Sequence, residues 1–276
     1  MTDNPLIADL DTLAGAIADG ATVVLPRDHS GTPMALVRAL IRRKARGLKL
    51  ITLTSAGLSA DLLIGAGCVE EIETPGVSLG EFGAAPRFTN AVKKGLIRIK
   101  DSTCPALHAR LQAAEKGVPF MPLRGIIGSD LLAVRPDWKV IDNPFGEGDD
   151  PIVLLPAANP DAAVFHASMA DDHGNVWVGR RMELKTAAHA ARESFVTVER
   201  FYEGDMIEDD RYAAGVIPAL YIGRIALAER GAWPMAFWDK YGRDSDHLRE
   251  YAKLARSDEG FEDYLAAHVF GDKVAA

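Results

Sequence analysis

Two glycine-rich segments carry side chains suited to acid–base chemistry, nucleophilic attack or anion binding. The first, from Val77 to Phe88, places Glu81 between glycines, where a carboxylate can act as a base or a nucleophile. A solvated surface glutamate has the same local sequence, so this segment alone leaves both interpretations open. We take Ser78, Gly80, Glu81 and Phe82 as candidate substrate-binding residues.

The second segment runs from Gly117 to Asp130 and predicts a rigid extended loop, because two prolines precede an arginine that is followed by two glycines. The guanidinium of Arg124 would lie there beside approachable backbone N–H groups and could hold a carboxylate or phosphate through two hydrogen bonds. A surface arginine in a Pro/Gly-rich loop is the alternative. Arg124, Gly125, Gly128 and Ser129 are therefore also candidate binding residues.

A third polar loop, residues 26–31, follows an apolar run. Asp28, His29 and Ser30 are the residue types of a hydrolase triad, but neighbours on an extended loop point in different directions, and triad residues meet through the fold. We therefore assign no catalytic residue in this chain. Arg27 and His29 are further candidates for substrate binding.

Metal binding is not expected, because His29, His166 and His173 lack metal-ligand spacing with cysteine or with one another.

Cys104 stands beside Pro105 at an expected helix start, where a thiol pKa can be lowered. A small buried hydrophobic residue is the alternative for Cys104. Cys68 and Cys104 are too few for a disulfide framework, so both are expected to be reduced.

Helical and strand patterns alternate along the first half of the chain. The expected strands are Thr22–Leu25, Leu48–Thr54, Val69–Glu73 and Ile97–Lys100, and the expected helices are Leu10–Ile17, a helix from Met34, Ser59–Ile64, Phe88–Lys94 and Pro105–Lys116. Such alternation predicts an α/β fold with an open, mostly parallel sheet flanked by helices. Ligands in such sheets lie beyond the carboxyl ends of the strands, which points to the loops after Leu25, Thr54, Glu73 and Lys100.

The second half contains an acidic, glycine-rich turn at residues 146–151, which we do not take as a domain boundary. Ile152–Pro156 and Ala162–His166 are expected to continue the same sheet. After Pro234 the pattern is helical. The prediction is one domain over residues 1–276, in which residues 235–276 form a helical C-terminal extension.

Composition excludes several classes of function. The chain has 276 residues, is 48% hydrophobic and 25% charged, and has a formal charge of −8, so it is globular and an unlikely partner for nucleic acid. It contains no GxGxxG or P-loop pattern. No leader pattern and no apolar run of membrane-spanning length are evident, so we expect a cytoplasmic protein with no membrane association.

The segment Asp171-Asp172-His173-Gly174-Asn175 lies between two apolar strands and is typical of a tight turn. Together with Gly117 to Arg124, Asn143-Pro144-Phe145 and the Asp61 to Gly67 segment, it resembles the A subunit of family I coenzyme A transferases, especially the glutaconate type. The matches occur in the family's order and span roughly residues 18 to 255.

The resemblance implies half of a two-chain enzyme that moves coenzyme A between an acyl-CoA and a carboxylic acid, with a dicarboxylic acid as one candidate. The nucleophilic glutamate would belong to a B-type partner chain in an A2B2 heterotetramer. Coenzyme A would be a co-substrate, and no tightly bound cofactor is expected. The carboxylate would attack the acyl-CoA carbonyl and form an anhydride, and returning CoA would give an enzyme thioester.

Departures from the family pattern keep alternatives open. The family's Gly-Gly-Phe loop after the first strand is replaced here by residues 26–31. Related ring-cleaving hydrolases use a glutamate of the A chain, and in register with them Cys104 stands at that position. Hydrolysis or decarboxylation of a CoA thioester is therefore the alternative enzyme class, and a non-enzymatic acyl-CoA-binding protein is a third hypothesis.

Overall fold

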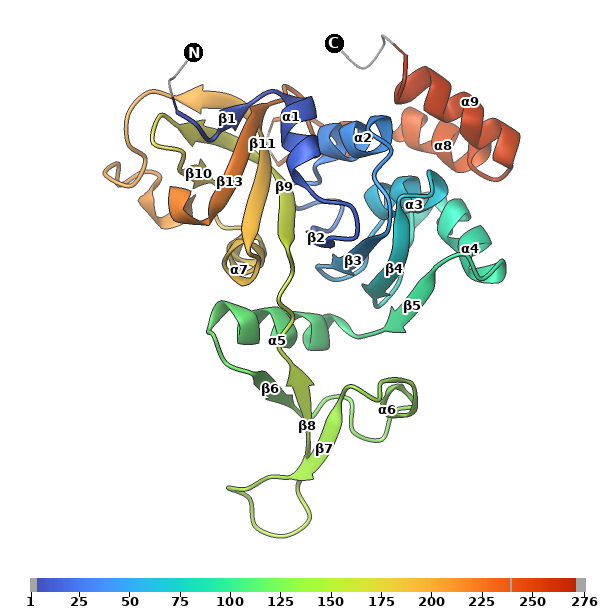
Figure 1. Ribbon diagram of the computed structural model, residues 1–276, viewed down its shortest axis with the longest axis vertical. Coiled ribbons are helices and arrows are strands. Elements are labelled where there is room, and N and C mark those ends of the chain that lie inside the picture. The colour runs from blue at the N-terminus through green and yellow to red at the C-terminus, as the bar shows by residue number, and fades with distance from the viewer. Residues whose placement is uncertain (1–3, 239, 272–276) are drawn as a thin grey trace.

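The computed structural model describes residues 4–238 and 240–271, and a sheet of mainly parallel strands runs through the centre of the molecule (Figure 1). The path β1-β13-β11-β9-β2-β3-β4-β5 is parallel throughout, and β10 and β12 extend the sheet in antiparallel pairing. The strands of this sheet are β1 (Ile7–Ala8), β2 (Thr22–Leu25), β3 (Leu48–Thr52), β4 (Val69–Thr74), β5 (Arg98–Asp101), β9 (Ala162–Asp171), β10 (Val176–Trp177), β11 (Glu193–Tyr202), β12 (Val216–Ile217) and β13 (Ile222–Leu227).

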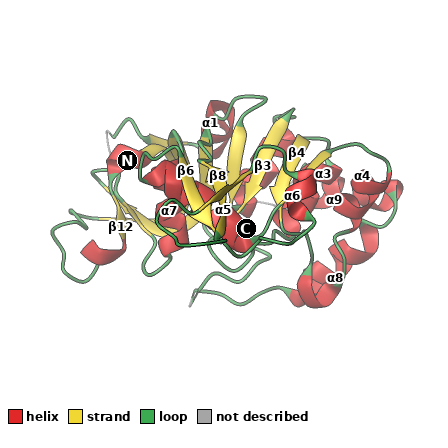
Figure 2. Cartoon of the chain, turned by 90° about the horizontal axis from the view of Figure 1, so that it is seen from below, coloured by secondary structure: helices red, strands yellow, loops and turns green. Residues whose placement is uncertain are grey.

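Helices cover both faces of this sheet, as Figure 2 shows. They are α1 (Leu10–Ala16), α2 (Met34–Arg42), α3 (Leu58–Gly65), α4 (Pro86–Lys93), α5 (Cys104–Glu115), α6 (Leu131–Val134), α7 (Met182–Ala190), α8 (Ser245–Leu254) and α9 (Asp258–His268), with short 3-10 turns η1 (Gly80–Phe82), η2 (Ala213–Gly215) and η3 (Ala219–Tyr221). The predicted fold class, an open and mostly parallel sheet flanked by helices, is confirmed.

Side-chain alternation along the strands explains the two helical layers. On β2, Val23 and Leu25 pack into a core with α1, α2 and α3, whereas Val24 faces the opposite side. There it meets a second core that includes Leu107 and Leu111 of α5 and residues of α7. Successive residues of a strand point to opposite faces, so a strand that is apolar throughout is buried on both sides.

One expectation for the second half was wrong. Residues 152–156 do not continue the main sheet; they belong to β8 (Pro151–Pro156), the central strand of a separate antiparallel sheet with β6 (Phe120–Leu123) and β7 (Lys139–Asp142). A short apolar run looks the same in either sheet, and β8 pairs instead with β7, which precedes it across the turn at residues 146–150. This small sheet lies apart from the main one, beyond α5 (Figure 1).

Glu73, at the end of β4, ties the small sheet to the main one. Its carboxylate is ion-paired with Arg110 of α5 and, at 2.9 Å, with Arg135 just after α6. Arg135 is almost fully buried, and it also donates to the carbonyl of Asp101 at 2.8 Å and lies over the ring of Trp138. Both arginines therefore share one buried carboxylate, and Arg135 is also paired with Asp137 at 2.8 Å.

The turn at residues 171–175 is a tight connection between β9 and β10, as predicted. The buried carboxylate of Asp171 accepts hydrogen bonds from the backbone N–H groups of His173, Asn175 and Met206, each between 2.9 and 3.0 Å long. Gly174 adopts a φ of +86°, a conformation that glycine takes without strain. This turn is held by two of its own backbone donors and by that of Met206.

The C-terminal helices α8 and α9 pack beside α3 and α4 (Figure 1). Tyr251 of α8 donates to the buried carboxylate of Asp61 on α3 at 2.7 Å, and Phe261 of α9 fills the space that the absent Cβ of Gly65 leaves. Of the helical extension predicted over residues 235–276, residues 245–254 and 258–268 are helical, whereas the described residues of 235–244 form turns and an isolated β-bridge between Phe237 and Tyr241, so that part of the prediction was wrong. Residues 272–276 lie outside the described residues, and the single-domain assignment stays a prediction. Within the described ranges, no helix has both the length and the apolar character needed to cross a membrane.

We predict that Glu73→Gln lowers the free energy of unfolding by about 3 kcal/mol, because the largely buried Arg110 loses its ion-pair partner and the buried Arg135 keeps Asp137 but loses Glu73. Urea denaturation measures this. The matched control is Glu70→Gln, which removes an exposed partner of Arg98 and should cost less than about 1 kcal/mol. Equal losses in the two variants would contradict the assigned role of Glu73.

Candidate functional site

A cavity of about 360 Å³ opens where β2, β3 and β4 end. Three loops and the C-terminal segment line it: Arg27, Asp28 and His29 after β2, Thr54, Ser55 and Ala56 after β3, Ser78, Leu79, Gly80 and Phe82 after β4, and Met235, Arg243 and Leu248. The carboxyl edge of a parallel sheet is where ligands bind in folds of this kind. The cavity is therefore our candidate site.

The loop after β3 is strained. Thr54 has a φ of +67°, a value that β-branched residues rarely adopt. Its carbonyl oxygen accepts a hydrogen bond from the hydroxyl of the buried Thr52. The same Thr52 hydroxyl lies 2.9 Å from the hydroxyl of Thr74. Strain of this kind persists only where surrounding contacts enforce it, and it is common at binding sites.

Asp28 is the most unusual acid of the cavity. Its Oδ2 accepts a hydrogen bond of 3.1 Å from the backbone N–H of Leu58, the first residue of α3. Its Oδ1 is inaccessible and has no hydrogen-bond partner among the described residues. Burial raises the pKa of Asp28 to about 6, although the bond from Leu58 acts in the opposite direction. Asp28 is therefore protonated in part of the molecules near neutral pH.

The position of Asp28 requires a glycine opposite. A Cβ added at Gly57 would lie 1.8 Å from Oδ2 of Asp28, which no side chain can tolerate. The close approach holds the loop after β2 against the start of α3. The two residues that flank Asp28 in this loop, Arg27 and His29, both line the cavity.

Two arginines and a histidine lie at the opening of the cavity. Arg27 and His29 are exposed, and burial together with the charges of Arg27 and Arg243 holds the pKa of His29 below its usual value. Arg243 forms an ion pair with Glu81, and its guanidinium lies 5.0 Å from the ring centre of Phe82. Glu81, a candidate base or nucleophile, is thus paired with a cation.

A second cavity of about 640 Å³ adjoins the first and shares Phe82 with it. Its wall on α8 and the following turn carries Arg249, Lys253 and Arg256, and Glu81 lies opposite. Three cations on one wall favour polyanionic ligands such as phosphates.

Behind the site, a buried network joins the loop after β2 to the C-terminal segment. His166 of β9 lies 2.8 Å from the hydroxyl of Thr197 and 2.7 Å from the carboxylate of Glu199. Burial lowers the pKa of His166, so the ring is neutral at pH 7, and since a carboxylate only accepts, we assign the ring proton to Nε2. Glu199 also accepts from the hydroxyl of Tyr241 and from the backbone N–H of Arg230.

The structure brings together only some of the predicted site residues. Arg27, His29, Ser78, Gly80 and Phe82 line the first cavity, and Glu81 lines the second.

The other predicted residues, Arg124, Gly125, Gly128 and Ser129, follow β6 in the small sheet and line neither cavity. Arg124 is engaged by both carboxylate oxygens of Asp150. A ligand role for any of the ten residues stays a prediction.

Other lining residues were not among our candidates. Asp28, Met235, Arg243 and Leu248 line the cavity, and the last three lie in the C-terminal segment, far from the loops in sequence. No local pattern marks Arg243 as a site residue, whereas the apolar strand that ends at Leu25 does mark the loop containing Asp28.

Because the pKa of Asp28 rises from 3.8 to about 6 on folding, its protonation stabilises the fold fully below pH 3.8, and this contribution is lost as the pH rises through about 6. We predict that Asp28→Asn matches the wild type in stability near pH 4 and exceeds it by about 1–3 kcal/mol above pH 6, because the variant buries no charge. Urea denaturation across this pH range measures the difference. The control Asp263→Asn, at an exposed residue of α9, should show a pH-independent difference, and the same flat profile for Asp28→Asn would contradict the prediction.

Three curated relatives align with almost the whole chain. An uncharacterised protein of Archaeoglobus fulgidus is 30% identical over 98% of this chain, which spans only 60% of that protein. The A subunit of the 3-oxoadipate CoA-transferase of Pseudomonas knackmussii is 32% identical, covering 97% of this chain and 95% of its own length. The IpdA component of the cholesterol ring-cleaving hydrolase of Rhodococcus jostii is 29% identical, with coverage of 96% and 92%.

Two solved structures share the fold. Glutaconate coenzyme A-transferase from Acidaminococcus fermentans superposes with a TM-score of 0.88 at 26% identity, over 96% of this chain and 89% of that one. A variant of the decarboxylase AibA/AibB gives a TM-score of 0.81 at 28% identity, over 94% of this chain and 98% of that one.

The family model described as coenzyme A transferase matches residues 8–228. The chain therefore belongs to the coenzyme A transferase family.

Proposed function

We propose that this chain is one half, of the A type, of a two-chain enzyme that transfers coenzyme A between an acyl-CoA and a carboxylic acid. The observation that carries the proposal is the cationic cavity at the carboxyl ends of β2, β3 and β4. Both carboxylates beside it are engaged, Asp28 against α3 and Glu81 with Arg243. We therefore assign the nucleophilic glutamate to a B-type partner chain, in an assembly of two chains of each type.

The proposed reaction needs an anion-binding surface from this chain. The partner's carboxylate attacks the acyl-CoA carbonyl and expels the CoA thiolate, leaving an acyl anhydride on the enzyme. The thiolate then attacks the enzyme's carbonyl in that anhydride, so the free acid departs and the enzyme retains a thioester. A second acid repeats these steps in reverse and leaves as the new acyl-CoA.

The cations suit the substrates of this reaction. A guanidinium can bind a carboxylate through two hydrogen bonds, so Arg27 is the proposed contact for the distal carboxylate of a dicarboxylic acid. Arg249, Lys253 and Arg256, on the wall of the second cavity, are the proposed contacts for the phosphates of coenzyme A. Coenzyme A would act as a co-substrate, and we propose no tightly bound cofactor.

Hydrolysis or decarboxylation of a CoA thioester is the second candidate. A relative named as a ring-cleaving hydrolase is similar to this chain in sequence, and a decarboxylase shares its fold. Asp28, with a pKa of about 6, could exchange a proton near neutral pH. A non-enzymatic acyl-CoA-binding protein is the third. A neighbouring B-type gene with the nucleophilic glutamate supports transfer, one without it supports hydrolysis or decarboxylation, and no partner supports binding alone.

Trapping of the enzyme thioester tests the transfer mechanism. The chain co-expressed with its B-type partner is incubated with acetyl-CoA or succinyl-CoA and then treated with borohydride, which reduces an enzyme thioester to an alcohol. We expect inactivation that requires acyl-CoA and a mass change confined to the B-type chain. Full activity after this treatment would refute the thioester mechanism.

Substitution of one arginine tests the binding surface. We predict that Arg27→Ala raises KM for 3-oxoadipate or glutaconate by about 10-fold or more and leaves KM for acetate within about 2-fold, because only a dicarboxylic acid presents a second anion. Initial-rate kinetics of the two-chain enzyme measure both constants. Arg98→Ala, at an exposed position of β5, is the control, and an equal effect of Arg27→Ala on both acids would contradict the assignment.

A further inference from the structure

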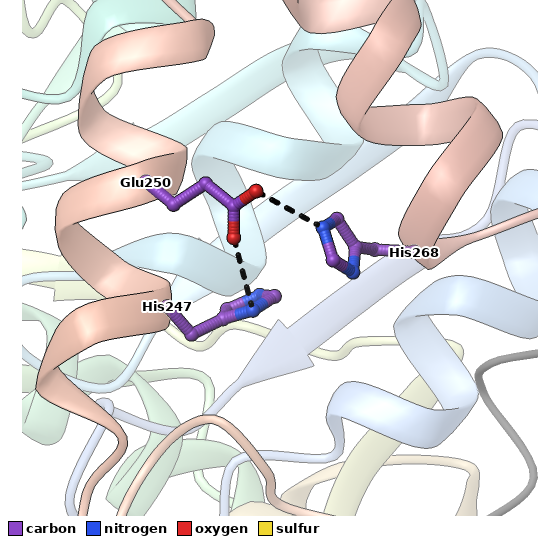
Figure 3. Close-up of side chains that lie close together, drawn as sticks. All are labelled: His247, Glu250 and His268. Atoms are coloured by element: carbon purple, nitrogen blue, oxygen red, sulfur yellow. Dashed lines mark ion pairs between the residues drawn. The ribbon is translucent and has the colours of Figure 1, made fainter.

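Two histidines and a glutamate from different turns of the C-terminal helices converge at a separate place on the molecule. His247 and Glu250 lie one turn apart on α8, and His268 is the last residue of α9 (Figure 3). One potential ligand atom from each lies within 4.8 Å of the other two. From the sequence we expected no metal site in the chain; that expectation rested on the spacing of His29, His166 and His173 and did not consider His247 or His268.

The spacing of the three side chains is too wide for hydrogen bonds. Nδ1 of His247 is 4.0 Å from Oε2 of Glu250, and Nε2 of His268 is 3.7 Å from Oε1. Bonds of about 2.0–2.2 Å to a tetrahedral zinc ion place neighbouring ligand atoms about 3.4 Å apart. Small side-chain rotations would close the difference. Figure 3 shows both imidazole rings turned toward the one carboxylate.

The surroundings of the group fix the His247 ring and leave the Glu250 side open to solvent. Nε2 of His247 lies 2.7 Å from the hydroxyl of Tyr264, and the ring of Trp233 packs at a centroid distance of 4.3 Å. A histidine that ligates a metal through one nitrogen characteristically hydrogen-bonds an oxygen through the other. His247 is buried, whereas half of the Glu250 side chain is exposed, so an ion can enter from solvent.

We propose that His247, Glu250 and His268 bind a zinc ion that clamps α8 to the end of α9. Two imidazoles and one carboxylate favour Zn²⁺ over Mg²⁺ or Ca²⁺, which prefer oxygen ligands. Three protein ligands leave the fourth tetrahedral position for water. The guanidinium of Arg38 lies 5.1 Å from the centre of the Trp233 ring that packs on His247, and it is a nearby positive charge that opposes the cation.

The clamp would act on the wall of the candidate site. Leu248 and Arg249, which follow His247 directly, line the first and second cavities. Fixing α8 at His247 and Glu250 would therefore restrain these two side chains. The zinc proposal rests on the three ligands alone and is independent of the proposed function.

Metal titration of the full chain tests the site. The chain is purified without a histidine tag, stripped with a chelator and titrated with Zn²⁺ by calorimetry, and with Co²⁺ while visible absorption is recorded. We expect one ion per chain, cobalt absorption typical of a tetrahedral site, and a melting temperature about 5 °C higher when zinc exceeds its Kd about 100-fold.

Matched variants separate this site from adventitious binding. His268→Ala and Glu250→Gln should weaken zinc binding about 100-fold or more and abolish the shift in melting temperature, while metal-free melting stays near that of the wild type. Tyr264→Phe should weaken binding about 10-fold. His189→Ala removes a histidine paired with a single carboxylate, Glu115, and should change nothing. Wild-type affinity in His268→Ala, or no binding by the wild type at 1:1 stoichiometry, would overturn the proposal.

Discussion

The carboxylate of Glu199 is the point at which the two halves of the candidate site meet. It accepts from His166 of β9, from Tyr241 and from the backbone N–H of Arg230. His166 also holds the loop after β2 in place, because its backbone N–H donates a hydrogen bond of 2.7 Å to the carbonyl of Gly31 in that loop. Burial acts to raise the pKa of Glu199, but its three donors hold it below the usual value. The charged form is thus the one that the fold requires.

This arrangement explains how residues far apart in sequence form one cavity. Tyr241 lies two residues before Arg243, so the bond to Glu199 brings that guanidinium to the edge of the sheet where Arg27 and His29 lie. The backbone at Gly231 packs directly on the His166 ring, where an added Cβ would lie 2.6 Å from Cε1. The C-terminal segment is therefore part of the site rather than an appendage to it.

The sequence predicts well what depends on local pattern. Thr22–Leu25 is a strand with the expected bounds, and the loops after Leu25 and Thr54 line the cavity because parallel strands share a carboxyl edge. The sequence predicts poorly what depends on contacts with distant residues, such as ion pairs and strand pairing. Arg27 and Arg124 look alike in sequence, yet Arg124 is paired with Asp150, 26 residues away. Residues 152–156 likewise could not reveal which sheet they join, since any apolar strand satisfies either one.

The loop after β2 differs from the Gly-Gly-Phe pattern that the family resemblance led us to expect, and its conformation depends on a second position of the chain. Asp28 fits only because residue 57 lacks a Cβ, and it lines the cavity together with the flanking Arg27 and His29. The Asp28 carboxyl, with a pKa of about 6, thus lies between the end of β2 and the start of α3. Positions 28 and 57 therefore constrain each other, and a change at either would alter the shape and the charge of the pocket together.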